Sequence, residues 1–207
     1  AAYNDLAGNI ILFRKFQIPS SGLYWLALYS ENRVLGTTDY INVKLKKLSR
    51  EAAKVLVLYL NSIFTIIQVL SLREETRGGW GRFDLVGMWD RVHIPDVASL
   101  PDSVLKDGLS LYDVVKKMDV LPLDERLRSM HDTQVNIDLF VAKLLGMEMD
   151  KDKLFRVYKA VLKELEILEN ILRALDEKEH KTTRQVKRST TTEKAETHTT
   201  LDRWMQY

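Results

Sequence analysis

The chain lacks cysteine entirely and has only four histidines and four prolines among its 207 residues. The absence of cysteine excludes disulfides, thiolate metal ligands and a cysteine nucleophile, and it fits a reducing, intracellular setting such as the cytoplasm. The histidines are scattered along the sequence, so we expect no histidine-rich metal site. There is also no large charge excess, because 31 lysines and arginines nearly balance 29 acidic residues. A role in binding nucleic acid must therefore rest on local clusters of basic residues.

Long hydrophobic runs are also scarce, and the main candidate lies between Val55 and Leu72, which contains no charged residue. A membrane-spanning helix needs about 20 apolar residues, and this run is interrupted by the amides of Asn61 and Gln68. We therefore expect a buried core helix with Ser49 as its N-cap, and no membrane span. The sequence opens without an initiator methionine or a signal peptide, which suggests a cytoplasmic fragment of a longer protein.

The residue combinations that are typical of an active site are not found. The segment Gly78-Gly79-Trp80-Gly81 lacks the lysine and the serine or threonine of a phosphate-binding loop, and it follows a helical pattern instead of a strand. Glu74 and Glu75 are adjacent, so their carboxylates point apart on a helix. His93 stands in a strand-like pattern, where a structural or solvent-facing role is more common than catalysis. We predict no catalytic residue, metal site or cofactor site in this chain.

The order of the hydrophobic patterns predicts an α+β fold, with strands first and helices second. Strands are expected at residues 10–18, 23–29, 34–35, 40–45 and 86–94, with a turn at 30–32. Helices are expected at residues 49–72, 102–118, 124–130, 132–145 and 150–177, with Gly146 as a C-cap. The result is a small antiparallel sheet around a central buried helix, followed by a helical subdomain with one long C-terminal helix.

These patterns divide the chain into three parts. Residues 1–97 form the α+β domain, residues 98–177 form the helical subdomain, and residues 178–207 form a polar tail that we expect to be disordered. The long helix at 150–177 carries an apolar seam made of Leu154, Tyr158, Val161, Leu165, Leu168, Leu172 and Leu175. That seam indicates either a coiled-coil homodimer or a helix packed along its own domain.

A basic, glycine-rich segment after the central helix is the best candidate binding surface. Arg73, Arg77 and Arg82 provide donors for phosphates or guanine edges, and Trp80 can stack on or wedge between bases. Three glycines let the backbone approach a ligand closely, namely Gly78, Gly79 and Gly81. The alternative is a helix end in which the arginines face the helix dipole, Gly78 is the cap and Trp80 returns to the core.

Residues 59–97, YLNSIFTIIQVLSLREETRGGWGRFDLVGMWDRVHIPDV, resemble the target-recognition region that follows the catalytic domain in N6-adenine-specific DNA methyltransferases of restriction-modification systems. The family pattern has a Leu-Asn-Ser helix, a glycine-rich loop and a short strand that ends in Ile-Pro. Here these are Leu60-Asn61-Ser62, residues 76–81 and His93-Ile94-Pro95, and the wider similarity covers residues 10–147. The resemblance implies that the chain binds duplex DNA through Arg73, Arg77, Gly78, Gly79, Trp80, Gly81 and Arg82.

The catalytic motifs of that family are missing. The family transfers a methyl group with an Asp/Asn-Pro-Pro-Tyr/Phe motif and a glycine-rich loop that binds S-adenosylmethionine, yet no two prolines are adjacent here. The resemblance therefore implies a specificity part whose catalytic domain, with its S-adenosylmethionine, lies outside this chain. Two alternatives stay open: a helical interaction module that dimerises through residues 154–175, and the specificity domain of a combined restriction and modification enzyme.

The C-terminal residues 198–207 carry a second resemblance, to the box by which archaeal and eukaryotic replication proteins bind the ring-shaped sliding clamp of the PCNA type. Leu201 and Trp204 match this box, Met205 replaces its second aromatic residue, and His198 stands where the box has glutamine. A tail suits such a peptide because it can reach a distant partner. The resemblance implies an archaeal protein tethered to its clamp, and the alternative is an apolar terminus folded back on the domain.

Overall fold

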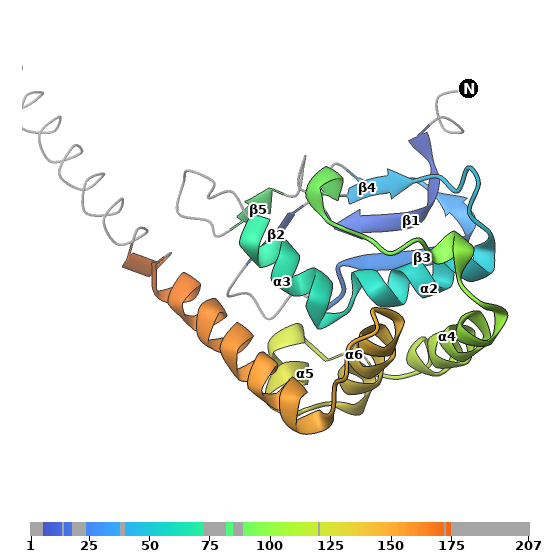
Figure 1. Cartoon of the computed structure of the whole chain (residues 1–207). Helices are drawn as coiled ribbons and strands as arrows, with labels where there is room; N and C mark the ends of the chain where they lie inside the picture. The colour runs from blue at the N-terminus through green and yellow to red at the C-terminus, as the bar shows by residue number, and fades with distance from the viewer. Residues whose placement is uncertain are drawn as a thin grey trace, which may run out of the picture.

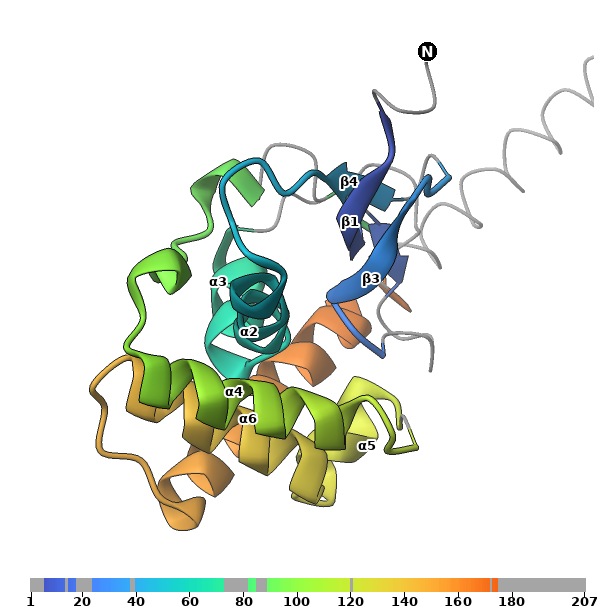
Figure 2. The same cartoon turned by 90° about the vertical axis from the view of Figure 1, so that its right-hand side faces the viewer.

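A computed structural model gives the α+β fold that the sequence predicts (Figure 1). It describes residues 6–13, 15–17, 24–37, 40–72, 82–84, 89–119, 121–171 and 173–174. A small antiparallel sheet lies against two consecutive helices, and further helices pack on the side of these two helices that faces away from the sheet. Figure 2 shows α2 (Arg50–Leu60) end-on, with the sheet on one side and α4 (Asp102–Val115) and α6 (Asp132–Leu144) on the other. The central helix is therefore buried on both sides, as expected.

The main sheet has three strands, and β1 (Gly8–Phe13) is the middle one. It pairs antiparallel with β3 (Ala27–Val34) and with β4 (Tyr40–Val43). The prediction of one strand over residues 10–18 is wrong in detail, because residues 15–17 form a separate strand, β2, that pairs with β5 (Arg82–Asp84). The predicted strand at 23–29 begins later, at Ala27, because the Asn61 side chain binds the backbone just before and at the start of β3.

The predicted turn at residues 30–32 is wrong, because these residues lie within β3. The pairing is irregular there: Gly8 pairs with Val34, but Ile10 already pairs with Tyr29, so β3 carries extra residues in a bulge. The Asn9 side chain bridges this bulge by donating from Nδ2 to the carbonyls of Ser30 at 3.2 Å and Glu31 at 3.3 Å. The polar residues 30–32 thus mark an interruption of the pairing instead of a chain reversal.

The predicted helix over residues 49–72 is wrong as a single helix, because the chain bends by 63° between α2 and α3 (Ile63–Leu72). An unbroken helix would use the Tyr59 carbonyl as the acceptor for the Ile63 N–H. The hydroxyls of Ser62 and Thr65 donate to that carbonyl instead, at 2.7 and 2.8 Å. The Ile63 N–H then turns to the Asp138 carboxylate at 2.8 Å. The predicted N-cap is confirmed, because the Ala52 N–H donates to Ser49 Oγ.

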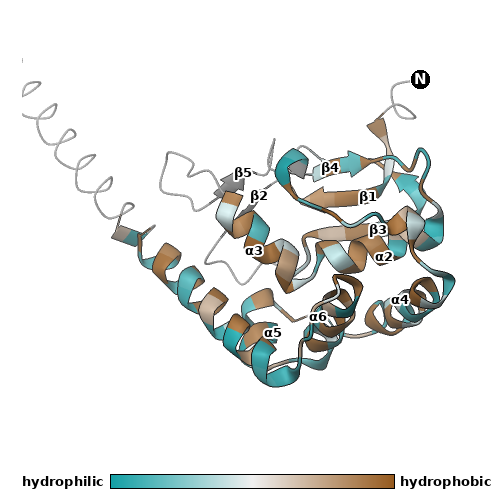
Figure 3. Cartoon of the chain, in the orientation of Figure 1, coloured by the Kyte–Doolittle hydropathy of each residue, from teal (hydrophilic) through white to brown (hydrophobic). Residues whose placement is uncertain are grey.

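The two helices also answer the membrane question for the described residues. No single described helix is long and apolar enough to cross a membrane. Of the helices that the structure describes, only the bent pair of α2 and α3, taken together, has the length and apolar composition of a membrane span. Most of their apolar residues are already covered by the rest of the chain. In Figure 3 much of the ribbon of both helices is brown, the colour of hydrophobic residues.

The helical part follows its prediction closely. Helices α4, α5 (Leu123–Arg128) and α6 are present. The C-cap of α6 is Leu145, one residue before the predicted cap Gly146, which has the left-handed φ of 69° typical of a glycine directly after a helix. A last helix, here called the C-terminal helix, runs over residues 151–171. At Gly108 in α4 an added Cβ would lie 2.7 Å from the Val55 side chain, so the glycine permits close packing of α4 on α2.

The predicted strand at residues 86–94 is wrong over its described part. Residues Trp89–Arg91 form a short 3-10 helix, η1, and residues 92–96 form no strand before a second one, η2 (Val97–Ser99). The physical reason is visible at His93, whose N–H and carbonyl are both bonded to side chains of the central helices. These side chains take the backbone groups that a neighbouring strand would need.

Two hydrophobic cores hold the fold together. One lies between the sheet, α2, α4 and α6, and the other between α3, α5, α6 and the C-terminal helix. Phe64, just after the bend, packs against both cores. Each core combines residues from before and after the expected domain boundary at residue 97. Four residues of the predicted seam are buried in the second core, namely Leu154, Tyr158, Val161 and Leu168.

Candidate nucleic-acid interface and its support

The candidate recognition loop begins where α3 ends, at Leu72, and ends where β5 begins, at Arg82. Its start therefore depends on the direction of α3. Its end is held by β5, in which Arg82 pairs with Gln17 of β2. The backbone of Arg82 lies in this strand, while the other predicted DNA contacts lie outside the described residues, namely Arg73, Arg77, Gly78, Gly79, Trp80 and Gly81. The clamp-binding candidates also lie outside them: His198, Leu201, Trp204 and Met205.

Asn61 fixes the bend from which α3 departs. Its Oδ1 accepts hydrogen bonds from the N–H groups of Leu26 at 2.8 Å and Ala27 at 3.1 Å. Its Nδ2 donates to the carbonyls of Ala27 at 2.8 Å and Val57 at 2.9 Å. The buried amide thereby makes the four bonds its acceptor and donor sites allow, and ties the start of β3 to the end of α2. The sequence shows Asn61 only as an interruption of an apolar run and as part of a motif.

Asp138 of α6 anchors the beginning of α3. Its fully buried carboxylate accepts from the Ile63 N–H at 2.8 Å, from the Tyr158 hydroxyl at 2.5 Å and from Gln134 Nε2 at 3.1 Å. Burial raises the pKa of Asp138 to about 7, although these three donors and the charge of Arg126 act in the opposite direction. The first turn of α3, the positive end of its dipole, is thus held by a carboxylate.

Arg126 of α5 is the second buried charge in this region, with only 2% of its surface exposed. Its guanidinium stacks on the Trp25 ring, with Cζ 3.9 Å from the ring centroid, and Nη2 donates to the Tyr24 carbonyl. Its Nε and Nη1 are buried and find no hydrogen-bond partner among the described residues. Burial lowers the pKa of Arg126 to about 10, against the opposing effect of Asp138. Arg126 therefore stabilises the chain before β3 mainly by stacking on the Trp25 ring, and less by hydrogen bonding.

A clasp of three residues closes the ends of the candidate recognition segment. The hydroxyl of Tyr59, in α2, donates to the His93 carbonyl at 2.7 Å. Gln68, in α3, accepts from the His93 N–H through Oε1 at 2.8 Å, and its Nε2 donates to the same carbonyl at 3.2 Å. The Gln68 Nε2 also donates to the Tyr59 hydroxyl at 3.1 Å. Residues 59 and 93, which are 34 positions apart, are thus bonded directly.

The clasp brings together two of the motifs that carry the family resemblance. Leu60-Asn61-Ser62 forms the bend directly after Tyr59, and His93-Ile94-Pro95 begins at the clasp itself. His93 contributes through its backbone, so the structure gives its imidazole no part in the clasp. The sequence could not show that Gln68 and Tyr59 contact His93, because neither the spacing nor the residue types of this trio are typical of a known site.

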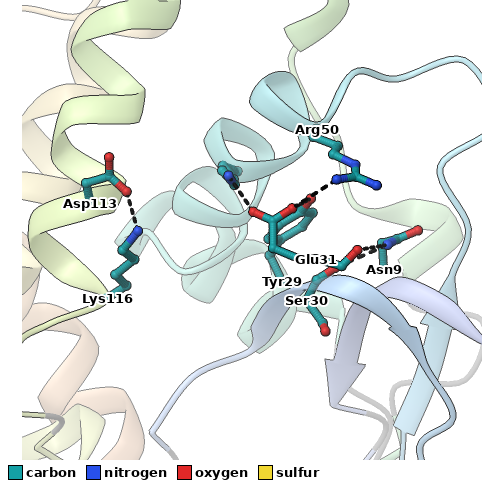
Figure 4. Close-up of polar contacts among 8 residues, drawn as sticks. Asn9, Tyr29, Ser30, Glu31, Arg50, Asp113 and Lys116 are labelled. Carbon is teal, nitrogen blue, oxygen red and sulfur yellow. Dashed lines mark hydrogen bonds and ion pairs between the residues drawn. The ribbon is translucent and has the colours of Figure 1, made fainter.

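A cleft of about 240 Å³ lies beside the bend, between β3, α2 and α4. Its walls include Trp25, Tyr29 and Tyr112, and Asn61 is part of its floor. The Lys54 ammonium lies 5.4 Å from the Tyr29 ring centroid and forms an ion pair with Glu31 at 2.7 Å. Figure 4 shows Glu31 close to Tyr29 and paired with Arg50. The ion pair and the rings already satisfy this cation. The cleft could not be predicted from the sequence, because its lining residues come from four segments that are far apart in the chain.

Within the described ranges, no three histidine or acidic side chains lie close enough together to hold a metal ion. The buried carboxylate of Asp138 is occupied by three donors and is closed off from solvent, which suits a structural role. The described residues thus hold the chain on both sides of the candidate recognition segment. Comparison of the chain with known protein families, with curated proteins and with solved structures finds no match.

Proposed function

We propose that this chain is the DNA-recognition part of an adenine-specific DNA methyltransferase, and that it binds duplex DNA through the loop at residues 73–82. The proposal combines the basic and glycine-rich sequence of the loop with the resemblance of residues 59–97 to target-recognition regions. Methyl transfer, S-adenosylmethionine and the flipping of the target base belong to a catalytic domain outside this chain. The same proposal applies if the chain is the specificity domain of a combined restriction and modification enzyme, which would differ in residues that this chain does not contain.

The observation that supports the proposal most is the clasp between Tyr59, Gln68 and His93. Binding loops work best when a rigid scaffold holds their two ends, because the ends then need not be ordered on binding. Here the bend at Asn61 directs α3, and the clasp returns the chain to the same place after the loop. A segment with three arginines is thereby presented from a fixed base, where guanidinium groups can contact phosphates and guanine edges.

The test is fluorescence anisotropy with labelled duplex DNA and the double variant Arg77→Ala with Arg82→Ala. Each guanine or phosphate contact contributes on the order of 1 kcal/mol or more, so we expect at least a tenfold loss of affinity. The matched control is Lys106→Ala with Lys151→Ala, which removes two exposed positive charges from helices instead of the loop. Affinity should change little in the control at the same salt concentration. Equal affinity in both variants would refute the loop as the binding surface.

We further propose that the C-terminal residues 198–207 tether the chain to a sliding clamp. The support is the order of Leu201, Trp204 and Met205 at the end of a polar tail, where apolar side chains gain most from a partner. Calorimetry with purified PCNA-type clamp should show binding that Leu201→Ala with Trp204→Ala abolishes. Thr199→Ala with Thr200→Ala is the matched control, since it changes two tail residues outside the apolar positions. Absence of heat with the intact chain would end this part of the proposal.

A further inference from the structure

A second surface, which shares no residue with the recognition loop, lies between α5 and the C-terminal helix. It is a groove of about 290 Å³, here called the basic groove, and its lining includes Arg128, Phe155, Tyr158, Lys159, Leu162 and Lys163. Its floor is firm, because Leu127 and Tyr158 are each only 1% exposed and the Tyr158 hydroxyl is bonded to Asp138 beneath it. Two residues of the hydrophobic core therefore form the base of the groove.

The rim of the basic groove is positively charged. Arg128, Lys159 and Lys163 are exposed and form no ion pair with another described residue. Glu166 is the single acidic residue of the lining, so three cations and one carboxylate leave a net charge of +2. By contrast, the cations Lys54, Lys116, Lys143 and Arg173 each pair with a carboxylate of this chain.

The groove also offers apolar surface to a partner. Phe155 is 43% exposed, and the Lys159 ammonium lies 4.7 Å from its ring centroid, so the cation and the ring stand together at the edge. Leu162 follows about two helical turns after Phe155 and is half-buried in the lining. Exposed aromatic and aliphatic groups beside unpaired cations are typical of surfaces that bind an amphipathic helix.

We propose that the basic groove binds an acidic, amphipathic helix of a partner protein. Its apolar side chains would lie on Phe155 and Leu162, and its carboxylates would pair with Lys159 and Lys163, which stand one helical turn apart. The charge of the rim selects an anionic partner. The apolar floor favours a peptide over a DNA backbone, because phosphates and sugars would leave Phe155 without apolar contact.

The probe is a fluorescein-labelled, helical peptide of about 16 residues, with leucines every third or fourth position and flanking glutamates. Anisotropy should report saturable binding to the whole chain, and Lys159→Glu with Lys163→Glu should weaken it at least tenfold. A peptide with lysine in place of each glutamate should bind that variant and not the original protein. This exchange of charges tests the pairing itself. Phe155→Ser should also weaken binding, and circular dichroism verifies that the fold is kept.

The matched control is Lys106→Glu with Lys151→Glu, which makes the same change of net charge outside the groove and should leave the peptide affinity unchanged. The proposal is overturned if the glutamate peptide does not bind, if a scrambled peptide binds equally well, or if the control variant loses as much affinity. It is also overturned, in favour of DNA, if labelled duplex binding depends on Lys159 and Lys163 while the peptide does not bind. Loss of the loop arginines leaves all these outcomes unchanged, so the two proposals fail separately.

Discussion

Two buried polar clusters lie on either side of the bend between α2 and α3, and they are built on different principles. The Asn61 cluster is neutral, and each polar atom of its side chain is bonded to backbone. The Asp138 cluster, which comprises Arg126, Gln134, Asp138 and Tyr158, is charged. Three of its buried atoms have no hydrogen-bond partner in the part of the chain that the structure describes, namely Arg126 Nε, Arg126 Nη1 and Gln134 Oε1. Both clusters hold an end of the same helix junction, so they can be compared directly.

The comparison shows why the two clusters should respond differently to change. A satisfied neutral amide contributes regardless of pH, and its removal leaves backbone groups unpaired. A buried charge costs desolvation that its bonds offset only in part, so its contribution depends on protonation. We therefore expect the Asn61 cluster to make the larger contribution to the free energy of unfolding. We expect the Asp138 cluster to determine how that free energy varies with pH.

The largest effect is expected from Asn61→Ala. The change removes four hydrogen bonds and leaves the buried Leu26 and Ala27 backbone groups without partners, so the free energy of unfolding should fall by about 4 to 5 kcal/mol. Denaturant unfolding followed by circular dichroism measures this loss. Asn42→Ala is the control, because its side chain makes a single bond to the described residues, from the Gly36 N–H, and its loss should cost about 1 kcal/mol. Similar losses in both variants would show that Asn61 does not organise the junction.

The second effect is a dependence of stability on pH. The pKa of Asp138 is raised from 3.8 to about 7 on folding, so the folded state holds a proton that the unfolded state has released between these values. Stability is therefore highest near pH 4 and falls as pH rises to 7, by up to about 4 kcal/mol from this group. The measurement is urea unfolding across this range for the original protein and for Asp138→Asn.

The difference between those two profiles isolates Asp138, because other titrating groups contribute equally to both proteins. Glu31 and Asp113, for example, have lowered pKa values caused by bonds to Lys54 and Lys116, and they act in the opposite direction below pH 4. The Asp138→Asn variant keeps an acceptor for the Tyr158 hydroxyl and has no charge to desolvate. Its profile should be the flatter one, and parallel profiles would mean that Asp138 is ionised throughout.

The sequence predicted the fold class, the N-cap at Ser49 and, to within one residue, the end of α6 before the left-handed Gly146, because these depend on periodicity and on residues close in the chain. It did not predict the bend, because the groups that end α2 include Asp138, 75 positions beyond Ile63. The strand expected at 86–94 failed for the same reason: its backbone partners are the side chains of Tyr59 and Gln68. The candidate loop could be identified from the sequence because its arginines and glycines lie in one short segment. The clasp could not, because Tyr59, Gln68 and His93 come together only in the folded chain.

The smallest effect is expected from Arg126→Met, which removes the cation and keeps a long, apolar side chain against Trp25. Two of the three guanidinium nitrogens have no partner within the described ranges, so the loss of the bond to the Tyr24 carbonyl is offset by the desolvation of the cation that is no longer needed. Stability should change by no more than about 1 kcal/mol. The pKa of Asp138 should rise further, because Arg126 no longer stabilises its carboxylate, and the pH-dependent fall in stability should extend above pH 7. A loss above about 3 kcal/mol, with the pH profile unmoved, would instead mean that Arg126 is well paired and that the two clusters are alike.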